Sequence, residues 1–284
     1  MFSDIKSRSK EILRLNNAKV FLVLLLFVIV SSFISPKFLS LNNLLTIIRQ
    51  VSVIGIVAIG QTYVILTGGI DLSVGSTLGL VVVVIAGTIA SHGLLIALVV
   101  GIVIGSIVGL VNGIGVSYGR VPAFIMTLGM LTFARGLAYL YTSGVPIQIN
   151  NNLFSTFGNG YFLGIPIPVY LYIFLLIVFS LLLKKTPFGR GVYAIGSNEK
   201  AAEIAGVPVI KFKTIVYIIA GFCASIGGIL YASQLGLGTP IAGELYELDT
   251  IAAVVIGGTT FAGGKGDLVG TFLGTLIMGV MANI

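Results

Sequence analysis

Apolar runs of about 20 residues recur along almost the whole of this 284-residue chain and limit it to one kind of fold. A helix needs a run of that length to cross the hydrocarbon core of a bilayer. The predicted spans lie near residues 20–35, 44–66, 74–91, 95–116, 123–142, 167–183, 214–235, 249–262 and 268–284. Only 9% of residues are charged, against about 25% in soluble domains, which excludes a soluble fold. We predict an all-α, polytopic membrane protein with about nine spans.

The first and the eighth of these runs differ from the rest. The run near 249–262 is short and Gly-rich, which favours a broken or re-entrant helix. No Ala-x-Ala-like cleavage site follows the first run, so we interpret it as an uncleaved span and not as a signal peptide. The expected domains are an N-terminal cytoplasmic segment, residues 1–19, and a transmembrane domain, residues 20–284.

Lys and Arg are distributed unevenly between the two sides of these spans. If the N-terminus is inside and the spans alternate, 13 of the 16 basic residues fall on the inside. These are Lys6, Arg8, Lys10, Arg14, Lys19, Arg120, Lys184, Lys185, Arg190, Lys200, Lys211, Lys213 and Lys265. Cytoplasmic loops carry such an excess, so the net charge of +7 requires no nucleic acid partner. We expect a multi-pass protein of the inner (plasma) membrane with a cytoplasmic N-terminus.

The last apolar run reaches Ile284 without a polar flank. By the same count, the C-terminus would lie outside or within the membrane, which is unusual for a bacterial inner-membrane protein. We therefore expect a truncated product that lacks a final loop and span.

Glycines recur every four residues on two of the predicted spans. One ridge holds Gly101, Gly105, Gly109 and Gly113, and the other holds Gly266, Gly270 and Gly274. Small residues at this spacing let helices approach closely in a membrane, so we interpret both ridges as packing faces without chemistry. The single Cys and the single His allow neither an intrachain disulfide nor a multi-His metal site. We predict no catalytic residue, no metal and no cofactor.

A polar, Gly-rich interruption that holds Gln61, Thr67, Asp71 and Ser73 separates two of the runs. One interpretation is an interfacial turn in which Asp71 and Ser73 cap the next helix, and we favour it because such caps are common. The other is a gate along a solute path, because a carboxylate near the membrane is costly. Arg135, 12 residues after the start of its span at residue 123, suits a structural pairing and a polar path equally.

A second Gly-rich interruption, residues 257–268, resembles the first in outline. Nine positions separate Thr62 from Asp71, and eight separate Thr259 from Asp267. Paired interruptions point to an internal repeat, and this similar spacing is the one sign of a repeat in the sequence. Lys265 lacks both the glycine spacing and the following Ser or Thr of a Walker phosphate loop, so ATP binding by that motif is excluded.

The polar stretch from Lys184 to Lys213 contains a short helix pattern. Asn198 suits an N-cap, Glu199 favours the first turn, and Gly206 followed by proline ends the helix. A helix of about eight residues is too short to be stable alone in water, so we expect its small Ala face to fit a groove on another protein. The alternative is a solvated connection that Lys side chains hold at the lipid headgroups.

Several stretches together carry a resemblance to a known family. They are residues 64–75 (Val-Ile-Leu-Thr-Gly-Gly-Ile-Asp-Leu-Ser-Val-Gly), 119–125 (Gly-Arg-Val-Pro-Ala-Phe-Ile), 189–206, 246–259 (Tyr-Glu-Leu-Asp-Thr-Ile-Ala-Ala-Val-Val-Ile-Gly-Gly-Thr) and 262–266 (Ala-Gly-Gly-Lys-Gly). From about residue 20 to its end, the chain resembles the membrane permease of ribose-type ABC sugar importers.

The resemblance implies a fold like that of type II ABC importers, with one span more than this chain shows. It also implies partners: a second and often identical permease chain, two cytoplasmic ATPase subunits and an external sugar-binding protein. The chain would be the translocation subunit for a monosaccharide such as ribose, with ATP hydrolysis confined to the partner. It would perform no covalent chemistry of its own.

The resemblance also assigns roles to residues. The family's Glu-Ala-Ala-type coupling motif matches in part, since Lys200 replaces its first Ala. The implied ATPase-coupling residues are Arg190, Asn198, Glu199, Ala201, Ala202 and Gly206. The acidic residues Glu244, Glu247 and Asp249, in an expected outer loop, would dock the binding protein. Gln61, Thr67, Asp71, Ser73 and Arg135 are the candidates for the translocation path or gate.

A self-powered secondary carrier or channel for a small polar solute is the alternative function. Such a protein needs intramembrane carboxylates for ion coupling. Only Asp71 and Asp267 are expected near the membrane, and both lie at interruptions. An export permease is a third option, which a requirement for an external binding protein would reject.

Overall fold

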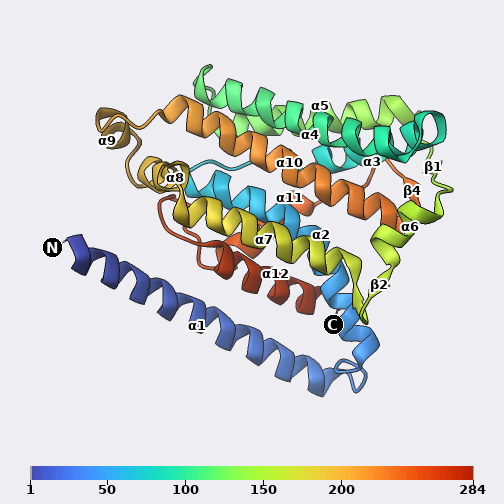
Figure 1. Cartoon of the computed structure of the whole chain (residues 1–284), viewed down its shortest axis with the longest axis horizontal. Coiled ribbons are helices and arrows are strands. Elements are labelled where there is room, and N and C mark those ends of the chain that lie inside the picture. The colour runs from blue at the N-terminus through green and yellow to red at the C-terminus, as the bar shows by residue number, and fades with distance from the viewer. Residues whose placement is uncertain (1, 284) are drawn as a thin grey trace.

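The chain folds into a bundle of helices that run roughly along one direction (Figure 1). The computed structural model describes the backbone of residues 2–283 and the side chains of residues 17–283. The helices are α1 (Phe2–Ile34), α2 (Leu41–Leu66), α3 (Val74–His92), α4 (Leu94–Ser117), α5 (Ala123–Thr142), α6 (Asn152–Asn159), α7 (Ile167–Lys185), α8 (Pro187–Ser197), α9 (Glu199–Ile204), α10 (Val209–Leu235), α11 (Tyr246–Ile256) and α12 (Leu268–Asn283). The strands are β1 (Ile147–Gln148), β2 (Tyr161–Phe162), β3 (Ile165–Pro166) and β4 (Leu237–Gly238), paired as β1 with β4 and β2 with β3.

Within residues 2–283, seven helices are long and apolar enough to cross a membrane. They are α1 from Asn17 onward, α2, α3, α4, α5, α7 and α10. α12 is apolar but has 16 residues, and α11 has 11. The all-helical membrane fold is confirmed, but the count of nine spans is not. The eighth predicted run fails as a full span because Gly243 and Gly258, both at positive φ, bracket α11 with non-helical backbone.

The expected border between an N-terminal segment and a membrane domain falls inside α1. This helix continues without a break through residues 19 and 20. Its side chains are described from Asn17 onward, so the predicted inside residues Lys6, Arg8, Lys10 and Arg14 lie outside the described side chains.

Helices α2, α3 and α10 form the centre of the bundle. In the apolar windows of α3 and α10, 72% of the residues are buried, against 28% in α4. Ile56 of α2, Leu78 of α3 and Leu230 of α10 are fully buried in one hydrophobic cluster. The outer helices therefore cover this centre and expose apolar side chains such as Phe133 and Phe174.

The glycine ridge on α4 is a packing face, as predicted: Gly105, Gly109 and Gly113 pack against α10, and Gly101 packs against Ile85 of α3. A Cβ added to Gly105 would lie 2.7 Å from the carbonyl oxygen of Gly221, and one added to Gly113 would lie 2.8 Å from that of Thr214. Real Cβ contacts are not that short, so the two helices meet backbone to backbone. These contacts hold residues 214–225 of α10 against α4.

The second ridge is confirmed only in part. A Cβ on Gly270 or Gly274 would overlap the carbonyl oxygen of Gly257 or Ala253, so α12 packs closely on the end of α11. Gly266 is not on this face, because it precedes α12 and has a φ of +144°. Its role is to turn the chain into the helix, which only glycine does without strain.

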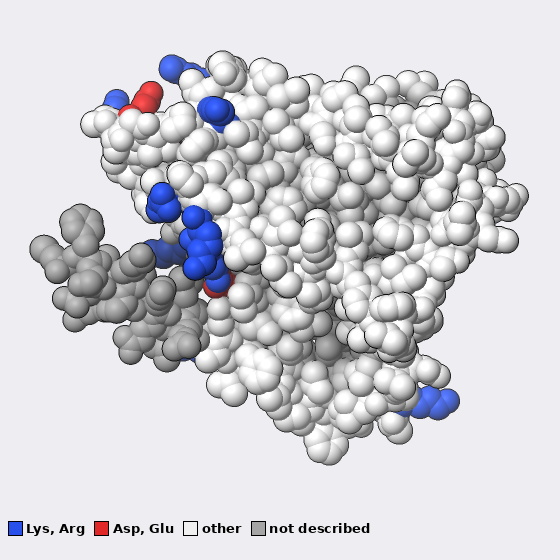
Figure 2. Space-filling view, viewed as in Figure 1, with Lys and Arg blue, Asp and Glu red and all other residues white. Residues whose placement is uncertain are grey.

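The two ends of the bundle differ in charge. α8, α9 and the loop between α11 and α12 lie at one end (Figure 1), and Figure 2 shows most of the visible Lys and Arg side chains gathered there. We call it the basic end. The opposite end, called the far end, holds α6, β1 and β2, together with the α1–α2 turn and its Lys37. The sequence predicted this separation.

Candidate functional site

The short helix predicted in the polar segment at the basic end is present as α9. The side chain of Asn198 accepts a hydrogen bond from the backbone N–H of Ala201 at 2.9 Å, which is the predicted N-cap. The helix has six residues, fewer than the eight expected, because Ala205 already leaves helical geometry and Gly206 follows at a φ of +81°.

A second helix in this segment, α8, has no counterpart among the predicted elements. It begins with Pro187, and the hydroxyl of Thr186 accepts a hydrogen bond from the N–H of Gly189 at 3.2 Å. Threonine before a proline is a recognised helix start, so this signal was available in the sequence. We call α8 and α9 together the coupling segment. It exposes Arg190 at the basic end.

The predicted coupling residues do not all face outward. Asn198, Glu199, Ala201 and Gly206 are exposed, but Ala202 is 4% exposed. Ala202 packs in a small cluster with Ile195 and Val209. Its methyl group therefore holds α9 onto the bundle, while the neighbouring positions remain free for contact.

An ion pair joins the coupling segment to α10. Lys213 Nζ lies 3.0 Å from a carboxylate oxygen of Glu199, with side chains 17% and 53% exposed. A half-exposed pair contributes roughly 0–1 kcal/mol to stability. The pair links α9 to the first turns of α10, which is a central helix of the bundle. Fourteen positions separate the two residues, so no helical periodicity could have predicted the pair.

The two Gly-rich interruptions meet at the coupling segment. The N–H of Gly264, in the second interruption, donates to the carbonyl oxygen of Leu66 at the end of α2 at 2.9 Å. Gly196 of α8 lies directly against both groups, since a Cβ there would overlap the Leu66 oxygen and the Gly264 nitrogen. A Cβ on Gly263 would lie 2.8 Å from the N–H nitrogen of Gly68. We call this contact the junction.

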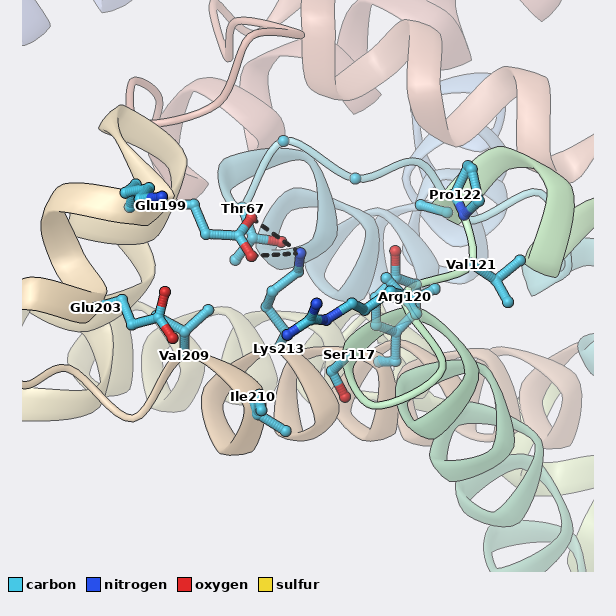
Figure 3. Close-up of a pocket in the computed structure, with 16 residues that line it drawn as sticks. Thr67, Ser117, Arg120, Val121, Pro122, Glu199, Glu203, Val209, Ile210 and Lys213 are labelled. Carbon is cyan, nitrogen blue, oxygen red and sulfur yellow. Dashed lines mark hydrogen bonds and ion pairs between the residues drawn. The ribbon is translucent and has the colours of Figure 1, made fainter.

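A cavity of about 570 Å³ opens beside the junction at the basic end (Figure 3). Its walls come from the first interruption, the α4–α5 turn, α9 and α10, and include Thr67, Arg120, Glu199, Lys213 and Tyr217. In Figure 3, Lys213 points into the cavity toward Glu199. The sequence assigned Thr67 to a path and Glu199 to coupling, and the structure brings them to one cavity.

The predicted cap at Asp71 and Ser73 is not formed. Ser73 precedes α3, but its side chain makes no capping hydrogen bond. Its N–H and hydroxyl both donate to Asp71, at 2.8 and 2.7 Å, and Asn112 of α4 donates to the Ser73 hydroxyl at 2.8 Å. Asp71 is 2% exposed, so the turn is buried among the helices. A gating role stays a prediction.

The sequence patterns did not single out two buried polar residues, Asn112 and Tyr217. Asn112, in an otherwise apolar span, was a usable signal for the Asp71 cluster. Tyr217 is fully buried, and a Cβ on Gly69 would lie 2.6 Å from its hydroxyl. Gln61 is also fully buried, and neither its amide oxygen nor its nitrogen is paired among the described residues.

Arg135 binds backbone and not a carboxylate. Its Nη1 donates to the carbonyl oxygens of Pro240 and Ala242, the latter at 2.8 Å. Glu247 and Glu244 are near enough to interact with it electrostatically. Both accepting carbonyls belong to a non-helical segment between α10 and α11, so Arg135 holds that segment in place.

The sequence predicted an outer loop after α10, but the segment that Arg135 holds packs inside the bundle. It runs along α3: Gly238 packs on Val82 and Val83, Ala242 on Gly79, and Gly243 on Gly75. We call residues 236–245 the α10–α11 connection. Glu244 is exposed, and Glu247 and Asp249 are partly exposed near the inner end of the segment. Docking of another protein by these carboxylates stays a prediction.

Replacing Arg135 with methionine is expected to destabilise the folded chain. The change leaves two carbonyl groups without their charged donor, and each such bond contributes about 1.5–3 kcal/mol. We expect a loss of about 3 kcal/mol, seen as a thermal midpoint several degrees lower in detergent. Arg120→Met, which removes an exposed guanidinium, is the matched control. An equal shift in both variants would contradict the assignment.

Among the side chains that the structure describes, no three of His, Cys, Asp or Glu gather closely enough to hold a metal ion. The polar groups of the site instead hold helices and breaks in place. The arrangement is that of a membrane bundle that carries a polar segment packed at one end.

Comparison with known proteins decides the family. The family of branched-chain amino acid transport system permease components matches residues 43–284. The chain belongs to this permease family. The permease is thus a multi-pass membrane protein of a transport system, and the expectation of a transport component without enzymatic activity is confirmed.

Individual relatives give the same result. The permease is 48% identical to the ribose import permease protein of Bacillus subtilis, over 93% of this chain and 83% of that protein. It is 43% identical to the ribose import permease protein of Escherichia coli K12, over 93% and 84%. It is 38% identical to the L-arabinose transport system permease of the same organism, over 91% and 79%. The resemblance to ribose-type permeases is confirmed, and no solved structure matches significantly.

Proposed function

We propose that this permease is the translocation subunit of an ATP-driven importer for a monosaccharide, ribose or a similar pentose. The observation that carries this proposal is identity of 43–48% to ribose import permeases over nine-tenths of the chain. Another relative, at 38% identity, is an L-arabinose permease, so the comparisons support the class of pentoses more strongly than ribose itself.

The basic end is the cytoplasmic end in this proposal, because cytoplasmic loops of membrane proteins collect Lys and Arg. The coupling segment then faces the cytoplasm, where ATPase subunits bind. α9 exposes Glu199 and Ala201 there, while the buried Ala202 anchors it. Movement of the segment reaches the junction through Gly196 and reaches α10 through the Glu199–Lys213 pair.

Two further partners complete the proposed assembly. A second permease chain supplies the other half of the sugar path, and an external sugar-binding protein delivers the sugar at the far end. The acidic residues Glu244, Glu247 and Asp249 are the docking residues predicted from the sequence. Glu244 lies at the end of the α10–α11 connection and Glu247 and Asp249 lie in the first turn of α11, beside the start of α3.

Reconstitution tests the function. The permease is co-expressed with the ATPase and the sugar-binding protein of a ribose importer and placed in vesicles with radiolabelled ribose or L-arabinose. We expect uptake that requires both ATP and the binding protein, because in this proposal the partner ATPase supplies the energy and the binding protein delivers the sugar. Uptake by the permease alone, driven by an ion gradient, would replace the proposal with a secondary carrier.

The ion pair between α9 and α10 provides a test of coupling. Glu199→Lys or Lys213→Glu alone is expected to lower ATP-driven uptake several-fold while ATP hydrolysis continues, because the tie between the two helices is lost. The double exchange restores the pair and should recover uptake. Thermal stability should stay nearly constant, since a half-exposed pair contributes at most about 1 kcal/mol.

Lys211→Glu is the matched control for this exchange. It makes the same charge change two residues away, on an exposed position of the same helix. Uptake that falls equally in Lys211→Glu and Lys213→Glu would reduce the effect to net charge at the basic end. A double exchange that fails to recover would contradict a direct mechanical role of the pair.

A further inference from the structure

The cavity beside the junction holds more basic groups than its own carboxylates pair. Its charged wall residues are Arg120, Lys200, Lys213, Glu199 and Glu203. Among the described side chains, only Lys213 and Glu199 of this set form an ion pair. Two basic residues and one acidic residue therefore remain without one. In Figure 3, the Arg120 side chain points into the cavity toward Lys213.

Two helices begin at the wall of the same cavity. Ala123 is the first residue of α5 and Val209 is the first residue of α10, and both line the cavity. The N-cap residues are Pro122 and Pro208, so neither helix has a side-chain cap for its first N–H groups. Such N–H groups, at the positive end of the helix dipole, attract anions. Both helix starts thus add to the positive potential of the cavity.

Tyr217 supplies a polar group that nothing else in the described chain uses. Its side chain is fully buried and lines the cavity, and its hydroxyl has no hydrogen-bond partner among the described residues. Buried polar groups in folded proteins almost always have a partner, because an unpaired one loses its hydration without compensation. Tyr217 lies four residues after Lys213, so the two side chains share one face of α10. A ligand oxygen in the cavity can satisfy both.

Phosphate is the anionic group that these donors fit best. The fork of N–H groups on arginine matches the oxygens of a phosphate, and uncapped helix N-termini are common phosphate sites. The volume of about 570 Å³ is that of a small-molecule site. The cavity also lies at the basic end, where the helices end, and basic pockets between the ends of membrane helices bind lipid headgroups.

We infer that this cavity binds a phosphate group, carried by an anionic lipid headgroup or by a soluble phosphate ester. Arg120 and Lys213 pair with its oxygens, and the hydroxyl of Tyr217 donates to it. The bound phosphate competes with Glu199 for Lys213, so occupancy loosens the link between α9 and α10. The inference goes beyond the proposed function, because this binding involves no sugar, no ATP and no partner protein.

Thermal unfolding of the purified full chain tests the inference, since a ligand that binds the folded state raises its thermal midpoint. In one arm, glycerol phosphate is added at constant ionic strength to the chain in phosphatidylcholine nanodiscs. In the other arm, the nanodiscs contain increasing fractions of phosphatidylglycerol and no soluble phosphate. We expect a saturable rise of the midpoint in at least one arm. The arm that shows it identifies the source of the phosphate group.

Substitutions then locate the site. We expect Arg120→Met to weaken the binding at least about tenfold and Tyr217→Phe to weaken it about threefold, because a charged donor contributes more than a neutral one. Glu199→Gln should strengthen the binding several-fold, since it removes the competing carboxylate. Lys211→Met is the matched control, because it removes one positive charge from an exposed position of α10 outside the cavity. The midpoint of each variant without ligand verifies that it is folded.

Three results would overturn the inference. The first is a midpoint that does not rise in a saturable way in either arm, which would leave a cavity for water alone. The second is an equal loss of binding in Arg120→Met and Lys211→Met, which would reduce the effect to net charge at the basic end. The third is weaker binding in Glu199→Gln. Because no sugar is transported in these measurements, their outcome is independent of the uptake assay.

Discussion

Replacing Gly196 with alanine is expected to abolish ATP-driven uptake by the permease. A Cβ at this position would overlap the carbonyl oxygen of Leu66 and the N–H of Gly264, and neither is the end of a flexible side chain. The methyl group must therefore push α8 away from the junction. We expect uptake to fall by at least about tenfold, which corresponds to about 1.4 kcal/mol of lost coupling, because the coupling segment then no longer contacts both interruptions.

The substitution separates the junction from the stability of α8 itself. Alanine is a better helix former than glycine by about 1 kcal/mol, so the isolated helix should gain from the change. Gly136→Ala in α5 is the matched control, since nothing lies within 4 Å of its added Cβ. Uptake and ATP hydrolysis are measured together in vesicles. Uptake within twofold of the original chain in Gly196→Ala would show that coupling does not need the close contact.

Replacing Gly221 with leucine is expected to prevent the bundle from assembling. An added Cβ would lie 2.9 Å from the backbone nitrogen of Gly109 and would overlap the carbonyl oxygen of Gly105. Overpacking in a tight core typically costs about 1–3 kcal/mol. The loss should exceed that range here, because the obstacle is the backbone of α4 and two central helices must separate.

Size-exclusion chromatography in detergent and thermal unfolding measure this effect. We expect Gly221→Leu to give aggregated protein or a thermal midpoint lower by at least about six degrees, since each kcal/mol shifts the midpoint of a chain of 150–250 residues by about 2–4 degrees. Gly129→Leu, on an open face of α5, makes the same substitution without a neighbouring obstacle. A monodisperse Gly221→Leu protein with an unchanged midpoint would contradict the backbone contact between α4 and α10.

Sequence patterns predicted those elements whose causes are local. The N-cap at Asn198 and the stop at Gly206 depend on a few neighbouring residues, so α9 appears where the pattern placed it. The glycine ridge on α4 repeats at helical spacing and packs as expected. The division of charge between two ends also follows from the chain alone, because each Lys or Arg is fixed relative to its nearest span.

Predictions that depended on depth within the bundle were less successful. Asp71 and Ser73 form a capping pattern, but Asn112 from α4 and the surrounding helices bury the pair. The acidic stretch after α10 has the composition of an outer loop. Glycines on α3, at positions 75 and 79, leave room for it to run into the interior. The sequence shows which residues are polar. Whether their backbone groups find hydrogen-bond partners inside the bundle depends on the helices packed around them.

The sequence alone determined that this chain is a helical membrane protein, which helices carry close packing, and which family of permeases it belongs to. Hydrophobic length, glycine spacing and extended motifs are properties of contiguous residues, so they survive without a structure. Only the tertiary structure decided that both Gly-rich interruptions meet Gly196, that Lys213 ties α9 to α10, and that the segment after α10 runs along α3. These contacts join residues from about 14 to more than 190 positions apart, and packing between helices sets them.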